Sequence, residues 1–469
     1  MQKRIASLFA GSALTVASAL GLAGATAMTA APAAQGLPVP VPLARTLTHA
    51  SFAAPPTTAQ CEKQLHIACY SPAQFHTAYD LSPLYKKGDN GSGETIVIVD
   101  SYGYQFIRSE LAAFDKGFRL PAPPSFKIIQ PAGPVPAFNP KLRPQMTGWA
   151  QETSLDVEYS HAIAPGANIL LVETPVPETL GTHGFPQIVH AENFVIDHHL
   201  GTVISQSFAA PEAGFPSAAS IMKLRSAYVN ASKHGVTVLA GTGDAGATGA
   251  KTLTAQGFAA TFFLHRVSDW PATDPLVTAL GGTRLHLDAS GNKFEPDTVW
   301  NESNLFNSPA ASSGGMSMVF PRPAYQNGVA GAVGNWRGNP DISMSAATDG
   351  SALVFLDAKA AQGPAGYYLI GGTSEATPEF AGIVAIADQV AGHGLGLINP
   401  ALYQMEAAHD AGIVDVTYGT NTVTFPQGGG VHTVRGWDAV TGYDLASGIG
   451  TIDAAQFVPE LVAVDGSHH

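Results

Sequence analysis

Hydrophobic runs and helical patterns alternate along this chain. The first clear run is Thr95–Asp100 (TIVIVD), which is typical of a buried β-strand. A helical pattern follows it, with apolar residues three or four positions apart at Ile107, Leu111, Phe114 and Phe118. Strands that alternate with helices predict an α/β fold in which helices flank a mostly parallel central sheet.

Six further apolar runs extend this alternation along the chain. They are NILLVE (168–173), TVISQSF (202–208), VTVLAG (236–241), LVTALGG (276–282), ALVFLD (352–357) and YYLIGG (367–372). Two helical segments lie among or after them, SIMKLRSAYVNASKHG (220–235) and EATPEFAGIVAIADQVAG (375–392). We expect all six runs to be strands of the fold.

The N-terminal 60 residues differ in character from the rest. Residues 1–33 combine the basic start MQKR, a long apolar stretch and small-residue cleavage sites, which together indicate a signal peptide and a secreted, extracellular protein. An uncleaved membrane anchor is the alternative. Residues 34–60 are rich in Pro, Ala and Thr, so we expect an extended linker rather than a full propeptide. The folded domain is then residues 61–465.

Composition narrows the possible partners and the redox state. The chain has 469 residues and a net charge of −13, which argues against nucleic acid and anionic membranes as partners. Its two cysteines, Cys61 and Cys69, are expected to pair in an exported protein, with two free thiols as the alternative.

A serine between a predicted strand and a predicted helix is the first candidate for chemistry. Ser374 lies in GGTSEATPEFAG (371–382), after YYLIGG and at the start of the helical pattern. The N-terminus of a helix offers unpaired N–H groups that favour a developing oxyanion. Ser374 is therefore a candidate nucleophile, although serine also commonly serves as a helix N-cap.

A pair of acidic residues is the second candidate. Glu152 and Asp156 are four positions apart in GWAQETSLDVEYS, so a helix would place both carboxyls on one face. If they are close and buried, they cannot both ionise easily and they share a proton. Such a pair is a general base that works in acid, where a histidine would be protonated. The alternative is a solvated acidic helix face.

Three segments together resemble the sedolisin family of serine-carboxyl peptidases. They are GTSEATPEFAG, the E-x-x-L-D-x-E pattern from Glu152, and GVTVLAGTGDAGATG (235–249). The resemblance runs from about Cys61 to Leu461 and implies a subtilisin-like three-layer fold. It also implies that Glu152, supported by Asp156, is the base for Ser374. In the third segment it implies that Asp244, in its protonated form, donates a hydrogen bond to the oxyanion.

Two rival interpretations follow from the same residues. A subtilisin-like peptidase would use a histidine base; Asp100 fits its first acidic position, but the chain has no HGTH segment, and His161 lacks the glycine-rich context. We therefore leave Asp100 outside the catalytic set. A non-catalytic exported binding protein of the same fold is the second rival. Glu375 departs from the family pattern, in which a small residue usually follows the serine.

The family resemblance also implies one structural Ca²⁺ ion near the C-terminus. The pattern AGIVDVTYG followed by a G-W-D turn assigns the side chains of Asp415 and Asp438 as ligands. The backbone carbonyls of Val416, Val434 and Gly436 complete the set, and such oxygen ligands suit Ca²⁺. Taken together, the expected protein is a secreted, monomeric, acid-active peptidase of protein or peptide substrates, either an endopeptidase or a tripeptidyl-peptidase.

Overall fold

The computed structural model describes residues 41–42, 45–46, 51–175 and 184–465. The expected signal peptide, residues 1–33, lies outside these described residues. No helix in the described ranges has both the length and the apolar character needed to cross a membrane.

A sheet of eight strands forms the centre of the fold, in the order β14-β13-β9-β7-β4-β6-β5, with β17 also paired to β13. Its neighbouring strands run parallel except for the antiparallel β13–β14 pair. The strands are β4 (Thr95–Ser101), β5 (Phe126–Ile129), β6 (Asn168–Thr174), β7 (Val203–Gln206), β9 (Thr237–Gly241), β13 (Thr278–Arg284), β14 (Thr298–Val299) and β17 (Ile342–Ser345). The predicted α/β class with a mostly parallel sheet is confirmed.

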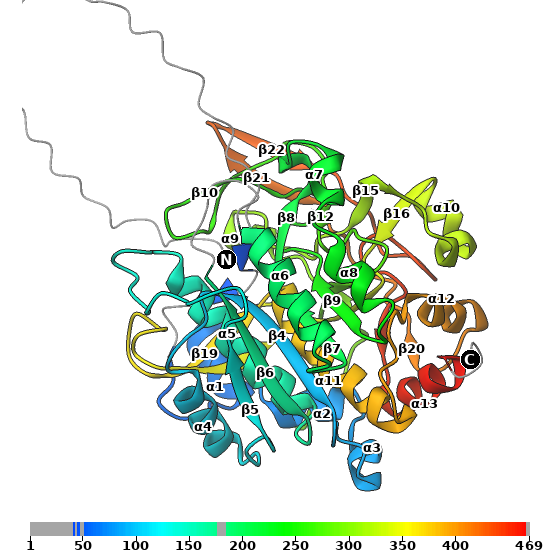
Figure 1. Cartoon of the computed structure of the whole chain (residues 1–469). Coiled ribbons are helices and arrows are strands. Elements are labelled where there is room, and N and C mark those ends of the chain that lie inside the picture. The colour runs from blue at the N-terminus through cyan, green and yellow to red at the C-terminus, as the bar shows by residue number, and fades with distance from the viewer. Residues whose placement is uncertain (1–40, 43–44, 47–50, 176–183, 466–469) are drawn as a thin grey trace, which may run out of the picture. The chain divides into compact units, whose positions relative to one another are not determined.

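Helices cover both faces of this sheet. The residues of β4 alternate between the faces: Ile96 and Ile98 belong to the core that contains the buried side chains of α5 (Met146–Ile163) and α11 (Thr373–Ala391). Val97 and Val99 belong to a separate core with α6 (Gly184–Asp197) and α8 (Ser226–Ala231). Figure 1 shows α6 and α8 in front of the strands. The arrangement is therefore three-layered.

Helix α5 is buried on all sides. Every one of its 18 residues except Thr147 is buried, including Glu152, Asp156 and Glu158. Because an isolated buried charge is very unfavourable, carboxyls in such a helix must be paired or protonated. Total burial also explains why the sequence of this helix has no strong amphipathic pattern.

Two of the predicted strands lie outside the main sheet. ALVFLD and YYLIGG correspond to β18 (Ser351–Leu356) and β19 (Gly366–Gly371), which pair antiparallel within a sheet of order β2-β19-β18-β3. Both runs are strands, as expected, and they pair with each other as a hairpin. The nine residues between them are too few for a parallel crossover, which needs a dozen or more, so only a hairpin is possible.

Two other predicted elements are divided. TVISQSF splits at Ser207 into β7 and β8 (Phe208–Pro211), and β8 leaves the main sheet to pair with β12 (Asp269–Trp270). The segment 220–235 was expected as one helix but forms α7 (Ala218–Met222) and α8. The side chain of Arg225, at the break, binds Asp274 with two hydrogen bonds of 2.5 and 2.8 Å.

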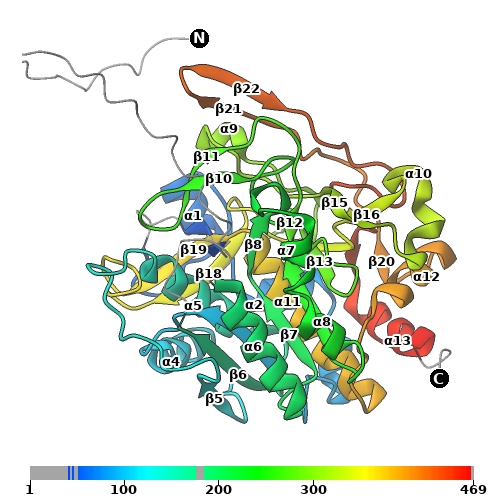
Figure 2. The ribbon, with the colours of Figure 1, turned by 45° about the horizontal axis from the view of Figure 1, so that its top comes forward.

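Part of the expected linker pairs with the folded domain. Strand β1 (Val41–Pro42) is antiparallel to β8, and β2 (Arg45–Thr46) is antiparallel to β19. Helix α1 (Thr58–Leu65) begins within the linker, and a disulfide joins its Cys61 to Cys69 in β3 (Cys69–Tyr70), as predicted. The remaining longer helices are α2 (Pro72–Ala78), α3 (Ser82–Lys87), α4 (Ile107–Phe118), α12 (Asn399–Ala408) and α13 (Ala454–Asp465), and Figure 2 shows the same body from a second direction.

Candidate active site

Ser374 occupies the second position of helix α11. The N-cap is Gly372, whose φ of +112° suits glycine, so Ser374 is not the capping residue. The Gly372 N–H donates to the carbonyl of Ala346 at 2.6 Å, which holds the turn before the helix. The Ser374 side chain is 0% exposed, and its Oγ has no hydrogen-bond partner among the described residues. The Ser374 hydroxyl thus lies at a helix N-terminus and makes no structural hydrogen bond with the described residues.

Helices α5 and α11 lie side by side and run in the same direction. Near the end of α5, Ile163 contacts α11 so closely that a Cβ on Gly382 would lie 2.7 Å from its Cβ. One turn earlier, Tyr159 lies close enough to Glu375 and Glu379 for their charges to raise its pKa. The preceding turns of α5 are therefore level with the first turn of α11. The carboxyls of Glu152 and Asp156 thus belong to the same end of the helix pair as Ser374.

The Glu152–Asp156 pair is fully buried. Asp156 Oδ1 accepts a hydrogen bond of 2.8 Å from the hydroxyl of Ser207, the residue at the break between β7 and β8. Burial raises the pKa of Asp156 well above its usual value, and the carboxyls of Asp100 and Glu152 raise it further. The two carboxyls can therefore hold a proton between them well above the pH at which ordinary carboxyls ionise.

Asp100 joins this group at the carboxyl end of β4. Burial raises its pKa to about 7, the hydroxyl of Thr153 lowers it, and Glu173, its neighbour across β6, raises it. The sequence analysis left Asp100 outside the catalytic set, yet its charge acts on Asp156. Its position at the end of a central strand was the available signal, because the carboxyl ends of parallel strands meet at one edge.

Asp244 lies beside the first turn of α11. Its Oδ1 accepts hydrogen bonds from the Thr373 backbone N–H at 2.8 Å and from the Thr373 hydroxyl at 3.0 Å. The N–H of Gly243 in turn donates to that hydroxyl at 3.2 Å. Thr373, which the sequence analysis did not single out, therefore joins the loop after β9 to the residue before Ser374.

A further carboxyl lies against this loop. A Cβ on Gly243 would be 2.4 Å from Oδ2 of Asp269, so only glycine fits there. Burial raises the pKa of Asp269 well above its usual value, with contributions from Glu212 and Asp244. The carboxyl of Asp269 thus lies close enough to Asp244 for the two groups to interact.

The rival histidine base has another environment. His161 lies on α5, but its Nε2 is 2.7 Å from the Pro121 carbonyl and 3.3 Å from the Asp115 carboxylate. No described histidine forms a hydrogen bond with Ser374 Oγ. The arrangement that a subtilisin-like mechanism requires is therefore missing from the described part of the chain.

The expected calcium ligands lie near the C-terminus. Asp415 and Val416 follow β20 (Ile413–Val414), whereas Val434 ends β22 (Gly430–Val434) and precedes Gly436 and Asp438. The Gly442 N–H donates to Asp415 Oδ2 at 2.8 Å, which brings the segment after Asp438 next to Asp415. Both aspartates are exposed. Within the described ranges, no group of three or more His, Cys, Asp or Glu residues could hold a metal. The expected set has only two such side chains, and its all-oxygen chemistry suits Ca²⁺.

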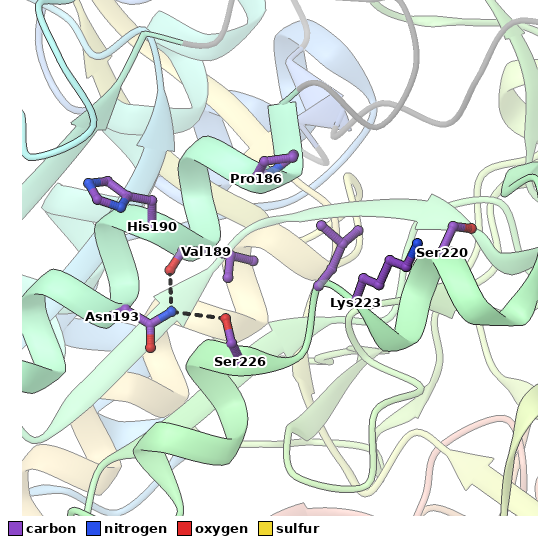
Figure 3. Close-up of a pocket in the computed structure, with 8 residues that line it drawn as sticks. Pro186, Val189, His190, Asn193, Ser220, Lys223 and Ser226 are labelled. Atoms are coloured by element: carbon purple, nitrogen blue, oxygen red, sulfur yellow. Dashed lines mark hydrogen bonds between the residues drawn. The ribbon is translucent and has the colours of Figure 1, made fainter.

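A surface hollow of about 590 Å³ lies elsewhere, between α6 and the α7–α8 segment. Figure 3 shows Asn193 of α6 hydrogen-bonded to the Val189 carbonyl and the Ser226 hydroxyl in its wall. None of the candidate catalytic residues lines this hollow. It is therefore not part of the candidate active site.

Comparison with known proteins gives three informative sequence matches. The chain is 30% identical over 391 residues to kumamolisin from Bacillus sp. (strain MN-32), covering 81% of this chain and 62% of that protein. It is 34% identical over 188 residues to sedolisin from Pseudomonas sp. (strain 101), covering 40% and 29%. It is 31% identical over 314 residues to tripeptidyl-peptidase 1 from Homo sapiens, covering 62% and 49%. The chain thus spans less than two thirds of the length of these relatives. No protein-family model matches the chain.

The fold is similar to that of a solved structure, Pseudomonas sedolisin (serine-carboxyl proteinase) complexed with two molecules of pseudo-iodotyrostatin. The TM-score is 0.68 at 24% identity, and the match covers 85% of this chain and 99% of that one. This likeness confirms the expected subtilisin-like architecture. Sequence similarity to kumamolisin over four fifths of the chain, together with a fold similar to that of sedolisin, supports the sedolisin family.

Proposed function

We propose that this protein is a secreted serine-carboxyl peptidase that hydrolyses peptide bonds in proteins or peptides at acidic pH. One observation supports this most strongly: α5, with its buried Glu152–Asp156 pair, packs beside α11, and the Asp244 carboxyl after β9 binds the N–H of Thr373, the residue before Ser374. The peptidase relatives agree with this reaction class. Export rests on the signal-peptide pattern of residues 1–33.

The first half of the proposed reaction forms an acyl-enzyme. Ser374 Oγ attacks the scissile carbonyl carbon while Glu152 takes the hydroxyl proton, and Asp156 stabilises the proton on the pair. Glu152 then delivers that proton to the leaving amine as the C–N bond breaks. In the second half, water attacks the acyl carbon, Glu152 takes its proton and returns it to Ser374 Oγ. Each proton is recovered, so the cycle needs no cofactor.

Asp244 supplies the oxyanion donor in this scheme. Both hydrogen bonds from Thr373 end on Oδ1, so Oδ1 acts as an acceptor and the proton of a neutral Asp244 resides on Oδ2. From there it donates to the oxyanion, together with the N–H of Ser374. The scheme therefore needs an uncharged Asp244 and a Glu152–Asp156 pair able to accept a proton, a combination that acid pH allows.

Replacing Asp244 by alanine should lower kcat about 10²–10³-fold, the usual loss for one oxyanion donor. Asp244→Asn keeps an acceptor for Thr373 and an N–H donor for the oxyanion, so it should lose less activity than the alanine variant. Steady-state kinetics on a chromogenic peptide from pH 3 to 8 measure both effects. Equal activity of wild type and Asp244→Ala would contradict the assignment.

The N-terminal segment indicates how a peptide substrate would bind. β1 pairs with β8, next to Ser207, and β2 pairs with β19 so that Arg45 lies opposite Gly371, three residues before Ser374. β1 and β2 thus pair with the edges of β8 and β19, which flank the candidate site. An extended substrate peptide would bind the same edges by adding as a strand.

A variant lacking residues 34–50 should therefore cleave a short peptide with a kcat/KM roughly 10-fold higher, because the edges become available. A synthetic peptide of residues 38–48 should raise the KM of this variant without changing its kcat. A scrambled peptide of the same composition is the control. Inhibition that lowers kcat instead of raising KM would argue against binding at these edges.

We also propose that Asp415, Asp438 and the carbonyls of Val416, Val434 and Gly436 hold one structural Ca²⁺ ion. The ion would link the segment after β20 to the segment after β22 and take no part in the chemical steps. Chelation by EDTA should lower Tm of wild type by several degrees and leave Tm of Asp438→Ala unchanged. A wild-type Tm insensitive to both EDTA and added Ca²⁺ would overturn this site.

A further inference from the structure

A second pair of carboxyls follows the candidate nucleophile on the same helix. Glu375 and Glu379 are four residues apart in α11, so they lie on one helical face, and both are 0% exposed. Neither belongs to the proposed Glu152–Asp156 base. Two acidic side chains on consecutive turns inside a protein are unfavourable unless something compensates them.

Glu375 connects α11 to both ends of the loop 346–350. Its Oε2 accepts from the N–H of Ala352 in β18 at 3.4 Å. Burial raises the pKa of Glu375 well above its usual value, although the hydroxyl of Ser345, at the end of β17, lowers it in part. The same loop contacts the turn before the nucleophile, because its Ala346 carbonyl accepts from Gly372. A Cβ on Gly371 would lie only 2.7 Å from that carbonyl. The carboxyl and the nucleophile turn therefore rest on the same loop.

Glu379 faces a different partner. Burial and the charge of Glu375 raise the pKa of Glu379 well above its usual value, and the hydroxyl of Tyr79, which follows α2, lowers it in part. The Tyr79 hydroxyl also accepts from the Ser345 N–H at 2.8 Å. Through Tyr79 and Ser345, both carboxyls are thus linked to the end of β17.

No cation neutralises the pair in the described part of the chain. The titratable groups that face it are Tyr79, Tyr159 of α5 and Glu302, with Asp297 and Glu158 acting on the two tyrosines. Lys293 lies 5.5 Å from the centre of the Tyr79 ring, but its Nζ binds Asp297 at 2.8 Å. A proton is therefore the charge compensation that remains.

The unsatisfied oxygens agree with a shared proton. Oε1 of Glu375 and both carboxyl oxygens of Glu379 are buried and accept no hydrogen bond of normal geometry from the described residues. A proton between the two carboxyls would satisfy one oxygen on each side chain. Its loss would leave two like charges on adjacent helical turns, directly after Ser374.

We propose that Glu375 and Glu379 are positioning residues for Ser374: the proton they share holds the first turn of α11 on the loop 346–350, and its loss ends activity as pH rises. This proposal rests on the proposed peptidase function. Deprotonation lowers activity in two ways. The two glutamate charges repel each other and displace the first turn of α11, and the added negative charge destabilises the oxyanion of the tetrahedral intermediate.

The test compares the pH dependence of kcat for wild type and for Glu375→Gln/Glu379→Gln. The amides keep the size and polarity of both side chains but cannot ionise. The pH at which activity falls to half on the alkaline side should rise by about one unit or more, with kcat at the optimum within about threefold of wild type and KM unchanged. Glu192→Gln is the matched control, because Glu192 is another fully buried carboxyl whose oxygens have no hydrogen-bond partner among the described residues, but it lies on α6. Its profile should match that of wild type.

An alkaline limb at the same pH in wild type and double variant overturns the proposal. If the double variant does not fold, Glu379→Gln serves instead, because it removes the repulsion while Glu375 keeps its contact with Ala352; an unshifted limb in this folded variant is equally decisive. Failure of the proposed function looks different: wild type would then cleave no peptide at any pH.

Discussion

Ser374→Ala is expected to lower kcat on a peptide substrate by on the order of 10⁴–10⁶-fold, since no other group can form the acyl-enzyme. Glu152→Gln should cost on the order of 10³-fold or more, because an amide has the same shape but cannot accept the hydroxyl proton. Both variants should fold normally: Ser374 Oγ makes no hydrogen bond within the described structure, and glutamine replaces glutamate without a change in volume. The pair of losses would assign nucleophile and base.

These variants also separate the rival functions. A histidine-dependent peptidase would keep its activity in Glu152→Gln and would become faster from pH 4 to pH 8, whereas the proposed enzyme loses activity over that range. The control is His161→Gln, because the His161 ring binds the Pro121 carbonyl and so is not placed to act as the base. This variant should keep the wild-type pH optimum. Full activity in Ser374→Ala would contradict the mechanism, and absence of cleavage by wild type from pH 2 to pH 8 would favour a non-catalytic binding protein.

The sequence predicted those features that depend on local pattern. β4, β6 and α11 were predictable because continuous apolar runs and helical periodicity directly reflect burial. Ser374 could be placed at a helix start for the same reason. β18 and β19 were predictable as strands, but their sheet was not, because a hairpin that is buried on both faces has the same apolar pattern as a parallel strand.

The acidic network was harder to predict, because burial of a carboxyl leaves no periodic signal. Asp100 and Asp156 come from different elements, and only the sheet brings them close enough for one to raise the pKa of the other. The role of Ser207 depends on a strand break that its apolar neighbours conceal. Glu379 follows Glu375 at the same four-residue spacing as the first pair, but only the burial of α11 shows that both carboxyls are enclosed.

Buried carboxyls extend well beyond the candidate site, which has a consequence for stability. Burial raises the pKa of Glu110 to about 8 and that of Asp388 to about 8, and it raises that of Asp100 to about 7. Below pH 4 such groups are protonated in both folded and unfolded chains. Between pH 4 and pH 8 the unfolded chain ionises while the folded protein keeps its protons, so the free energy of unfolding falls as pH rises.

We therefore expect Tm to be highest near pH 4 and to fall by roughly 10 °C by pH 8, since several groups each contribute on the order of a few kcal/mol. Glu110→Gln should reduce this fall by roughly 3 °C. Its amide can accept from the Asp357 N–H and donate to the Ser154 hydroxyl, replacing the two 2.6 Å hydrogen bonds of the carboxyl without a charge. Glu62→Gln, at an exposed carboxyl, should leave the fall unchanged. Thermal unfolding followed by circular dichroism at fixed ionic strength measures all three proteins. A Tm that rises between pH 4 and pH 8 would show that the buried carboxyls are ionised in the folded protein. That result would contradict a Glu152–Asp156 pair that shares a proton.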